Sequence, residues 1–231
     1  MMKKLSKRNI LLKEQIKEKS YSVDNGLTLL KTIGNAKFIE SVEAHISLNI
    51  NQKYSDQQLR ASLVLPNGTG KMLKIAALVD SDQTSDVLKL GADIAGSEDL
   101  IESISNGVLN FDILITSPQY MPKLAKLGRI LGPKGLMPSP KSGTVTTNLK
   151  DTIREFKQGK LEFRADKAGI VHLSFGKINF SEKQLKENLS AVFHSIEKHK
   201  PRGVKGKYFK SLYICPTMGP SINLELNSFK K

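Results

Sequence analysis

The chain has 231 residues and a net charge of +14, from 36 Lys and Arg against 22 Asp and Glu. This excess favours an anionic partner, either a nucleic acid or an acidic membrane surface. One cysteine excludes an internal disulfide and a cysteine-only zinc site. The absence of a long apolar run argues against a membrane-spanning segment.

The first 66 residues predict a charged amino-terminal segment followed by two strands. Residues 1–20 predict a solvated helix, with a direct RNA-binding arm as the alternative, and residues 27–35 a second, short helix. Alternation with a period of two then predicts a long strand with one buried and one exposed face. Its apolar face consists of Phe38, Val42, Ala44, Ile46, Leu48 and Ile50. A strand at 61–65 stops at a Pro- and Gly-rich turn, which predicts a domain junction.

Residues 67–159 have a different pattern. Continuously apolar runs at 73–79 and 111–116 are typical of parallel strands that are covered on both faces. They alternate with helical segments at 81–90 and 97–106, which predicts a Rossmann-like three-layer βαβ domain. A helix at 148–158 closes this domain, and Gly159 fits the position after a helix end.

After Gly159 the alternating pattern returns. Residues 161–164 and 170–175 predict a hairpin. Ser181 and Gln184 predict a capping box at the start of a helix, and further strands are expected at 208–214 and 222–226. The chain is therefore predicted to be an α/β protein, with a discontinuous α+β first domain (1–66 plus 160–231) and an inserted second domain (67–159). We expect a mixed or antiparallel sheet in the first domain.

The charge is divided unevenly between these two domains. Residues 67–159 contain 11 Lys and Arg against 10 Asp and Glu, whereas the rest of the chain contains 25 against 12. The main nucleic-acid surface is therefore expected on the first domain.

A basic loop at residues 121–145 is rich in Gly, Pro and Leu. It is too apolar for a solvated linker and too broken for one long helix, so it predicts an ordered, packed loop. Five cations give this loop a positive face: Lys123, Lys126, Arg129, Lys134 and Lys141. A secondary contact with RNA and a packing role are both compatible with this pattern.

The sequence offers little for catalysis. The four histidines, His45, His172, His194 and His199, fall on different predicted elements, so neither a metal site nor a catalytic cluster is expected. Cys215 is interpreted as a packing residue. A partial phosphate-loop pattern at 68–71 lacks the required glycine and hydroxyl positions. We expect no cofactor and no enzymatic activity.

RNA binding is better supported. An exposed sheet face with short polar donors, an occasional aromatic ring and lysines around it suits ribosomal RNA. Phe38 and the turn Thr217-Met218-Gly219 have this character, because Thr217 can donate a hydrogen bond and Met218 can make an adaptable apolar contact. The alternatives are that Phe38 belongs to the core and Thr217 to an ordinary turn.

The run Met-Pro-x-Leu-x-x-Leu-Gly-Arg-x-Leu-Gly-Pro-Lys-Gly-Leu-Met-Pro-x-Pro-Lys at 121–141 resembles the signature of the ribosomal protein L-one family. Similar landmarks occur at 36–38, 55–57, 65–68, 163–169 and 217–221, so the resemblance covers nearly the whole chain. It implies a large-subunit protein whose first domain binds the lateral stalk of ribosomal RNA. It maps RNA contacts onto Lys37, Phe38, Ser41, Glu43, Arg164, Asp166, Lys167, His172, Ser211, Thr217, Met218 and Gly219. Ser41 replaces the family's more usual Thr.

The resemblance also implies further partners and a location. They are exit-site tRNA, whose release the family assists, and the protein's own messenger RNA, whose translation bacterial members repress. We expect a monomer within the ribosome and no membrane partner. The bias to Lys over Arg and the abundant Asn and Ile favour a plastid location, with the bacterial cytoplasm as the alternative.

Overall fold

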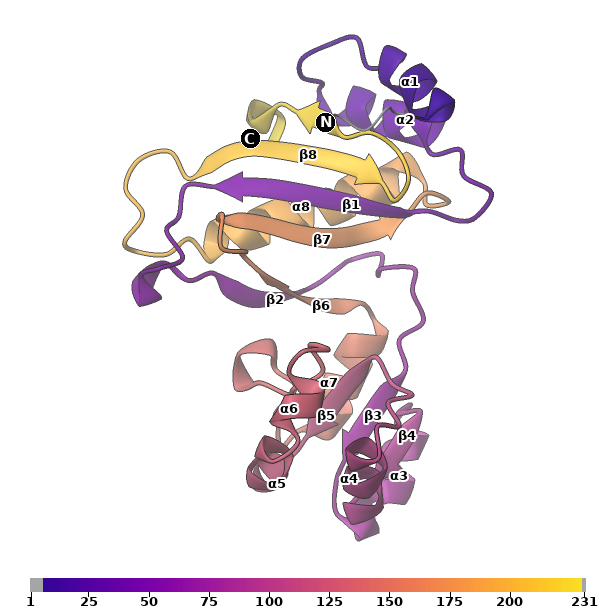
Figure 1. Cartoon of the computed structure of the whole chain (residues 1–231), viewed down its shortest axis with the longest axis vertical. Helices are drawn as coiled ribbons and strands as arrows, with labels where there is room; N and C mark the ends of the chain where they lie inside the picture. The colour runs from indigo at the N-terminus through magenta and orange to yellow at the C-terminus, as the bar shows by residue number, and fades with distance from the viewer. Residues whose placement is uncertain (1–5, 230–231) are drawn as a thin grey trace. The chain divides into compact units, whose positions relative to one another are not determined.

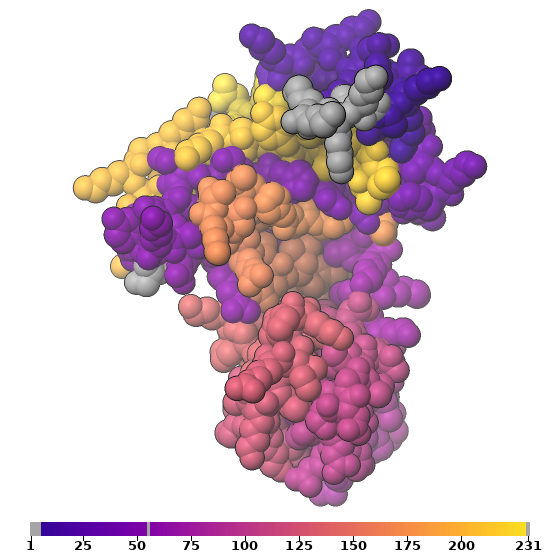
Figure 2. Space-filling model, viewed as in Figure 1, coloured from indigo at the N-terminus to yellow at the C-terminus, as the bar shows by residue number. Residues whose placement is uncertain are grey.

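The computed structural model describes residues 6–229, and the chain divides into two compact units. Unit 2 is Lys71–Glu162, and unit 1 consists of the two segments on either side, up to Gly70 and from Phe163. In the space-filling view, the indigo-to-purple atoms of the first segment and the orange-to-yellow atoms of the last one interleave in one body (Figure 2). Both boundaries lie a few residues beyond the positions expected from the sequence, and the second one falls inside a strand.

Unit 1 is built around a four-stranded antiparallel sheet of order β7-β1-β8-β9 (Figure 1). A separate two-stranded sheet pairs β2 with β6. The elements are α1 (Lys7–Glu14), α2 (Val23–Ile33), β1 (Ser41–Leu48), η1 (Ser55–Gln57), β2 (Arg60–Val64), β6 (Lys160–Arg164), β7 (Ile170–Lys177), α8 (Glu182–Lys198), β8 (Phe209–Pro216), β9 (Ile222–Leu224) and η5 (Leu226–Phe229).

The core of unit 1 lies between this sheet and two helices. Along β1 the side chains alternate strictly between partly exposed and buried, as the sequence pattern predicted. Helices α2 and α8 contact the sheet, and Figure 1 shows α8 behind β1 and β7. The predicted capping box is present, because the Ser181 side chain accepts from the Gln184 backbone and the Gln184 side chain accepts from the Ser181 backbone.

Three predictions for unit 1 need correction. First, β1 begins at Ser41, so Phe38 lies before the strand and is 55% exposed. Secondly, the expected hairpin is wrong, because β6 pairs with β2 while β7 pairs with β1. An isolated bridge joins Ala165 to Val171. After this bridge the chain passes from the sheet of β2 and β6 to the sheet that contains β7. Thirdly, the described part of the first predicted helix is helical only over Lys7–Glu14, and residues 1–5 lie outside the described residues.

Unit 2 has a three-stranded parallel sheet of order β4-β3-β5. Its elements are β3 (Ile75–Leu78), η2 (Ser81–Gln83), α3 (Thr84–Lys89), β4 (Ile94–Gly96), α4 (Glu98–Ser105), β5 (Ile113–Thr116), η3 (Pro118–Tyr120), α5 (Met121–Ala125), α6 (Gly128–Leu131), η4 (Pro140–Ser142) and α7 (Leu149–Lys157). Strand β4 was not predicted, and it is only three residues long. Gly159 has a φ of 103° directly after the helix end at Gln158, in agreement with the prediction.

The three-layer arrangement of unit 2 follows from β3, which is buried along its whole length. Ala76 and Leu78 belong to a core cluster that includes residues of α4 and the basic loop. Ile75 and Ala77 point to the opposite cluster, which includes residues of α3 and α7. Successive side chains of a strand point to opposite faces, so a continuously apolar strand must be covered on both.

The basic loop is ordered and packed, as predicted. Instead of one long helix it forms the two short helices α5 and α6 and the turn η4. Leu124, Leu127 and Leu131 are buried in the same cluster as Ala76 and Leu78. Among the residues described, no helix has the length and apolar character needed to cross a bilayer.

Candidate nucleic-acid interface

The candidate interface follows the open face of the sheet in unit 1, opposite α8. This face carries the partly exposed side chains of β1 and their neighbours on β7 and β8. The register pairs Glu43 with Cys215, His45 with both His172 and Tyr213, and Ser47 with Ser211. The predicted site residues Ser41, Glu43, His172 and Ser211 therefore share one surface, although they come from three strands.

At one end of this face, Thr217 is attached to the start of β1. The Thr217 hydroxyl accepts from the Ser41 backbone N–H at 3.0 Å and donates to the Ser41 carbonyl at 3.2 Å. The Thr217 N–H donates to the same carbonyl at 3.1 Å. In this structure the hydroxyl therefore fixes the turn. The Ser41 hydroxyl accepts from the Lys177 ammonium group at 2.8 Å.

The glycine of this turn is required by packing. A Cβ atom on Gly219 would lie 2.5 Å from Pro216 Cγ and 3.0 Å from Ile33 Cγ2. Close approach at Gly219 is therefore to the protein itself, which seats the turn against α2. Met218, next to it, projects outward and is 53% exposed. The turn thus holds an exposed thioether on a backbone that is tightly supported.

Arg8, which the sequence analysis did not single out, joins this turn to the loop before β1. Its guanidinium donates to Asn35 Oδ1 at 2.8 and 3.0 Å and to the Met218 carbonyl at 3.4 Å. It also lies 3.6 Å from Glu40 Oε1, and the Glu40 side chain is fully buried without a hydrogen bond. Lys37 and Phe38 are both exposed and lie in the sequence between Asn35 and Glu40, the two partners of Arg8 in this loop.

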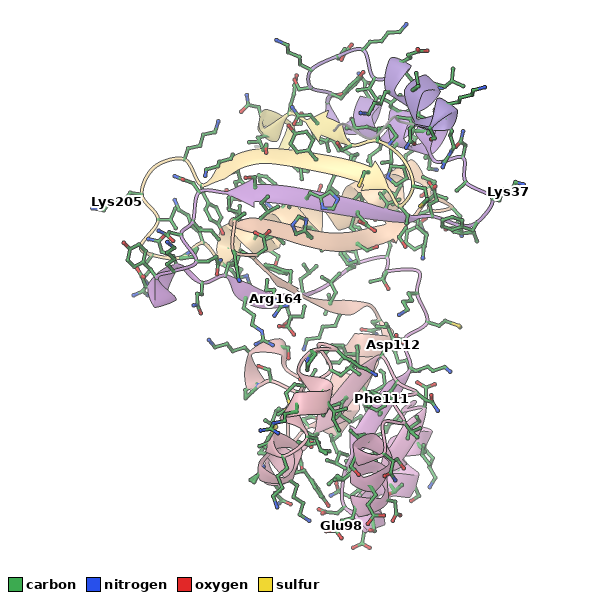
Figure 3. All side chains as sticks on the ribbon, in the orientation of Figure 1. Lys37, Glu98, Phe111, Asp112, Arg164 and Lys205 are labelled. Carbon is green, nitrogen blue, oxygen red and sulfur yellow. The ribbon has the colours of Figure 1, made fainter. Side chains whose placement is uncertain are left out.

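At the other end of the sheet, Asp166 shapes the turn into β7. Its carboxylate accepts from the N–H groups of Ile170 at 2.7 Å and Ala168 at 2.9 Å. The Ile170 bond is the main reason that the pKa of Asp166 lies below its usual value. Arg164 and Lys167 are exposed beside this turn. Figure 3 shows Lys37 and Lys205 projecting from opposite ends of the sheet.

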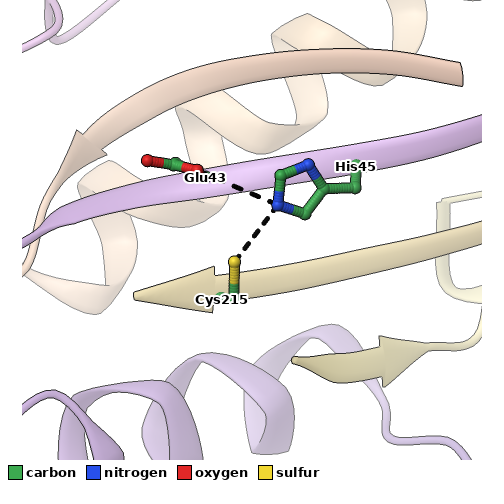
Figure 4. A group of neighbouring side chains, drawn as sticks. All are labelled: Glu43, His45 and Cys215. Atoms are coloured by element: carbon green, nitrogen blue, oxygen red, sulfur yellow. Dashed lines mark hydrogen bonds and ion pairs between the residues drawn. The ribbon is translucent and has the colours of Figure 1, made fainter. Parts of the chain in front are cut away.

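A cluster of titratable side chains lies in the middle of the face, which the sequence analysis did not expect. His45 Nδ1 lies 2.8 Å from His172 Nδ1. On the other side of the ring, His45 Nε2 lies 3.2 Å from Cys215 Sγ (Figure 4). Glu43 Oε2 is 3.9 Å from the same His45 nitrogen. Burial, more than the proximity of Glu43, raises the pKa of Cys215 to about 11. The pKa of His45 is lowered, mainly by burial and then by His172.

The prediction that the histidines and Cys215 do not converge is therefore wrong for His45, His172 and Cys215. The three residues lie on β1, β7 and β8, which are adjacent in space but far apart in the sequence. His194 lies on α8 and His199 directly follows this helix, and their side chains have Glu197 and the Ser195 carbonyl, respectively, as polar partners. Alternation placed Glu43 and His45 on one face, but nothing in the sequence gave the strand register.

The five cations of the basic loop form a separate set in unit 2. All five are exposed. Within the described chain, Lys123 is the one member of the five with an ion pair, to Glu98 at 2.6 Å. The other four are exposed to solvent, which is compatible with the positive face expected from the sequence.

Comparison with known proteins adds a decisive observation. The model of the Ribosomal protein L1p/L10e family matches residues 29–220, which include parts of both units. The chain belongs to this family. It is 56% identical over 229 residues to "Large ribosomal subunit protein uL1c" of Guillardia theta, covering 99% of this chain and 98% of that protein.

Two further relatives of the family agree. The chain is 57% identical to "Large ribosomal subunit protein uL1c" of Trieres chinensis, covering 99% of this chain and 100% of that protein. It is 54% identical to "Large ribosomal subunit protein uL1" of Prochlorococcus marinus (strain NATL1A), covering 99% of this chain and 97% of that protein. Membership of the L1p/L10e family, whose relatives here are ribosomal structural proteins, agrees with the expectation that the chain is not an enzyme.

Proposed function

We propose that the chain is a structural constituent of the large ribosomal subunit whose unit 1 binds the stalk region of large-subunit ribosomal RNA. The family match and the relatives' names support the ribosomal assignment. The RNA site is inferred from the open sheet face. Twelve residues form this proposed site: Lys37, Phe38, Ser41, Glu43, Arg164, Asp166, Lys167, His172, Ser211, Thr217, Met218 and Gly219.

The observation that carries this proposal is a pair of exposed apolar side chains beside the hydrogen-bonded residues Ser41 and Thr217, which we call the clamp. Phe38 and Met218 are 55% and 53% exposed, so both side chains are accessible to a partner. An aromatic ring and a thioether can contact the flat faces of unpaired bases. The hydrogen bonds between Ser41 and Thr217 fix the backbone directly before Met218 and shortly after Phe38, which reduces the ordering that binding must supply.

Cations surround this surface in positions that suit phosphate contacts. Lys37 and Arg164 are exposed at its two ends, and Lys205 and Lys207 extend the positive charge along the loop before β8. Lysine acts as a mobile point charge and positions the backbone of an RNA without reading its sequence. The proposed division is therefore phosphate contact by lysines and shape recognition by the sheet face.

Two further activities belong to the proposal. Unit 2 would contact exit-site tRNA or a second segment of ribosomal RNA through the basic loop, because its exposed cations lie on a packed and ordered scaffold. Unit 1 would repress its own messenger RNA if that RNA repeats the shape of the stalk site. The relatives named uL1c support a plastid ribosome over the bacterial cytoplasm as the location.

The test is a binding assay of the purified chain with a stalk fragment of large-subunit ribosomal RNA. A scrambled RNA of equal length is the control, and both are measured over a series of salt concentrations. We expect the preference for the stalk to persist as salt rises, because shape-specific contacts are less sensitive to salt than phosphate contacts. Equal and equally salt-dependent binding of both RNAs would refute the site.

A further inference from the structure

We propose that Glu43, His45 and Cys215 form a binding site for a thiophilic divalent cation such as Zn²⁺. The site lies on the open face of unit 1 and uses one oxygen, one nitrogen and one sulfur ligand. Glu43 also belongs to the proposed RNA surface, so the metal site is tested on the RNA-free chain, where ion binding does not depend on the RNA function.

The fold brings the three ligands together from two adjacent strands. Glu43 and His45 are two residues apart on β1, so both side chains point to the same face. Cys215 on β8 is the direct cross-strand partner of Glu43. Directly opposite and diagonal positions of an antiparallel pair are within side-chain reach of each other. The convergence is therefore fixed by backbone pairing.

The distances between the ligand atoms suit a tetrahedral ion after small side-chain rotations. With Zn–S near 2.3 Å and Zn–N near 2.0 Å, a tetrahedral ion needs about 3.5 Å between sulfur and nitrogen. The separation of Cys215 Sγ and His45 Nε2 is 3.2 Å, and that of His45 Nε2 and Glu43 Oε2 is 3.9 Å. All three ligand atoms lie within 4.8 Å of one another.

The contacts of His45 direct Nε2 at Cys215, whose thiol releases its proton to solvent when the ion binds. An imidazole that binds a metal through Nε2 carries its proton on Nδ1 and usually donates it to a neighbouring acceptor. His45 Nδ1 lies 2.8 Å from His172 Nδ1, which can accept this proton. His172 then carries its own proton on Nε2, which faces Asp166 Oδ2 at 3.6 Å. The chain of three side chains thus orients the ligand.

The ligand types select the class of cation. Thiolate and imidazole favour zinc and later first-row metals over magnesium and calcium, which prefer all-oxygen sites. Three protein ligands leave a fourth position for water. Glu43 and His45 are only partly buried, with side chains 38% and 28% exposed, so an ion can enter from solvent.

Titration of the RNA-free chain with Co²⁺ tests the site directly, because a cobalt–thiolate bond gives a charge-transfer absorption that other ligands do not give. The titration is performed with a phosphine reductant that keeps Cys215 reduced. We expect one equivalent to bind with this absorption, and Zn²⁺ to displace it. Cys215→Ala should abolish the absorption, and His45→Gln should weaken binding at least about tenfold.

Two further variants separate the ligands from their surroundings. His172→Phe should weaken binding about tenfold by removing the acceptor for His45. His194→Gln, which changes an exposed histidine on α8, should leave the affinity unchanged. Circular dichroism establishes that each variant is folded. A wild-type chain without the thiolate absorption, or equal affinity of wild type and Cys215→Ala, would overturn the proposal.

Discussion

The hydroxyl group of Thr217 makes two hydrogen bonds to the backbone of Ser41, accepting from its N–H and donating to its carbonyl. This side chain therefore continues the pairing of β1 and β8 beyond Pro216, where proline offers no N–H. Because the clamp lies beside Phe38 and Met218, it links the end of the sheet to the proposed RNA contacts.

Thr217→Val should weaken binding of the stalk RNA by about 1–3 kcal/mol, because the Ser41 backbone N–H loses its partner and the turn loses its position. Thr217→Ser retains the hydroxyl and should restore most of the affinity. Thr32→Val, on α2, removes an exposed hydroxyl that bonds to the Thr28 carbonyl and is the matched control. If Thr217→Val and Thr32→Val bind equally well in a filter-binding assay, the clamp has no part in recognition.

Lys205→Gln and Lys207→Gln should instead lower the affinity for every RNA. Each is expected to reduce the slope of log affinity against log salt by about one unit or less, since each lysine accounts for about one phosphate contact. Lys89→Gln, an exposed lysine on α3 of unit 2, provides the control. A loss confined to the stalk RNA would contradict the phosphate-contact role.

Asn188 is fully buried on α8 and holds three backbone groups together. Its amide donates to the carbonyls of Phe175 at 2.8 Å and Gly68 at 3.0 Å and accepts from the Asn67 N–H at 3.0 Å. Asn188→Leu should lower the free energy of unfolding by about 2–4 kcal/mol, because these buried groups lose their partners. Urea denaturation measures the loss, and a change within experimental error would show that water replaces the amide.

Unit 2 should lose stability in acid. Asp93 accepts from Lys157 and from the Ile75 N–H, and Asp112 accepts from Lys71 and from the Lys74 N–H. In both cases the lysine bond is the largest cause of a pKa below the usual value of 3.8. A lowered folded-state pKa stabilises the fold above the unfolded pKa, and this stabilisation is lost as pH falls through the folded pKa.

Thermal unfolding followed from neutral pH down to below about pH 4 measures this effect. Asp93→Asn should unfold at a lower temperature than wild type at neutral pH, and the difference should shrink in acid. Both carboxylates are partly exposed, so solvent screening keeps the effect small. The control is Asp82→Asn, which changes an exposed carboxylate on η2. A difference for Asp93→Asn that stays constant with pH would contradict the assignment.

The elements that the sequence predicted well are those fixed by local chemistry. The buried run around β3 can only be a strand covered on both faces, and Ser181 with Gln184 makes a cap from neighbouring residues. The alternation of β1 also indicated a buried carboxylate, which the prediction did not use. Glu40 lies in phase with Val42, so the same pattern placed a carboxylate on the buried side.

The features that the sequence did not reveal depend on contacts between distant segments. His45 and His172 are 127 positions apart, and Arg8 and Met218 are 210 apart. No periodicity encodes which strands become neighbours or in which register they pair. The prediction of a hairpin between β6 and β7 was wrong for the same reason. A turn between two strands does not determine whether they join the same sheet.

The position of β1 in its sheet has a consequence for how the chain is made. Both neighbours of β1, which are β7 and β8, begin only at Ile170 and Phe209. During synthesis the whole of unit 2 emerges before either neighbour exists. Until then β1 has two unpaired edges and an apolar face, the features by which nascent strands aggregate. Completion of unit 1 therefore waits for the last segment of the chain, so β1 remains unpaired through most of the synthesis of the protein.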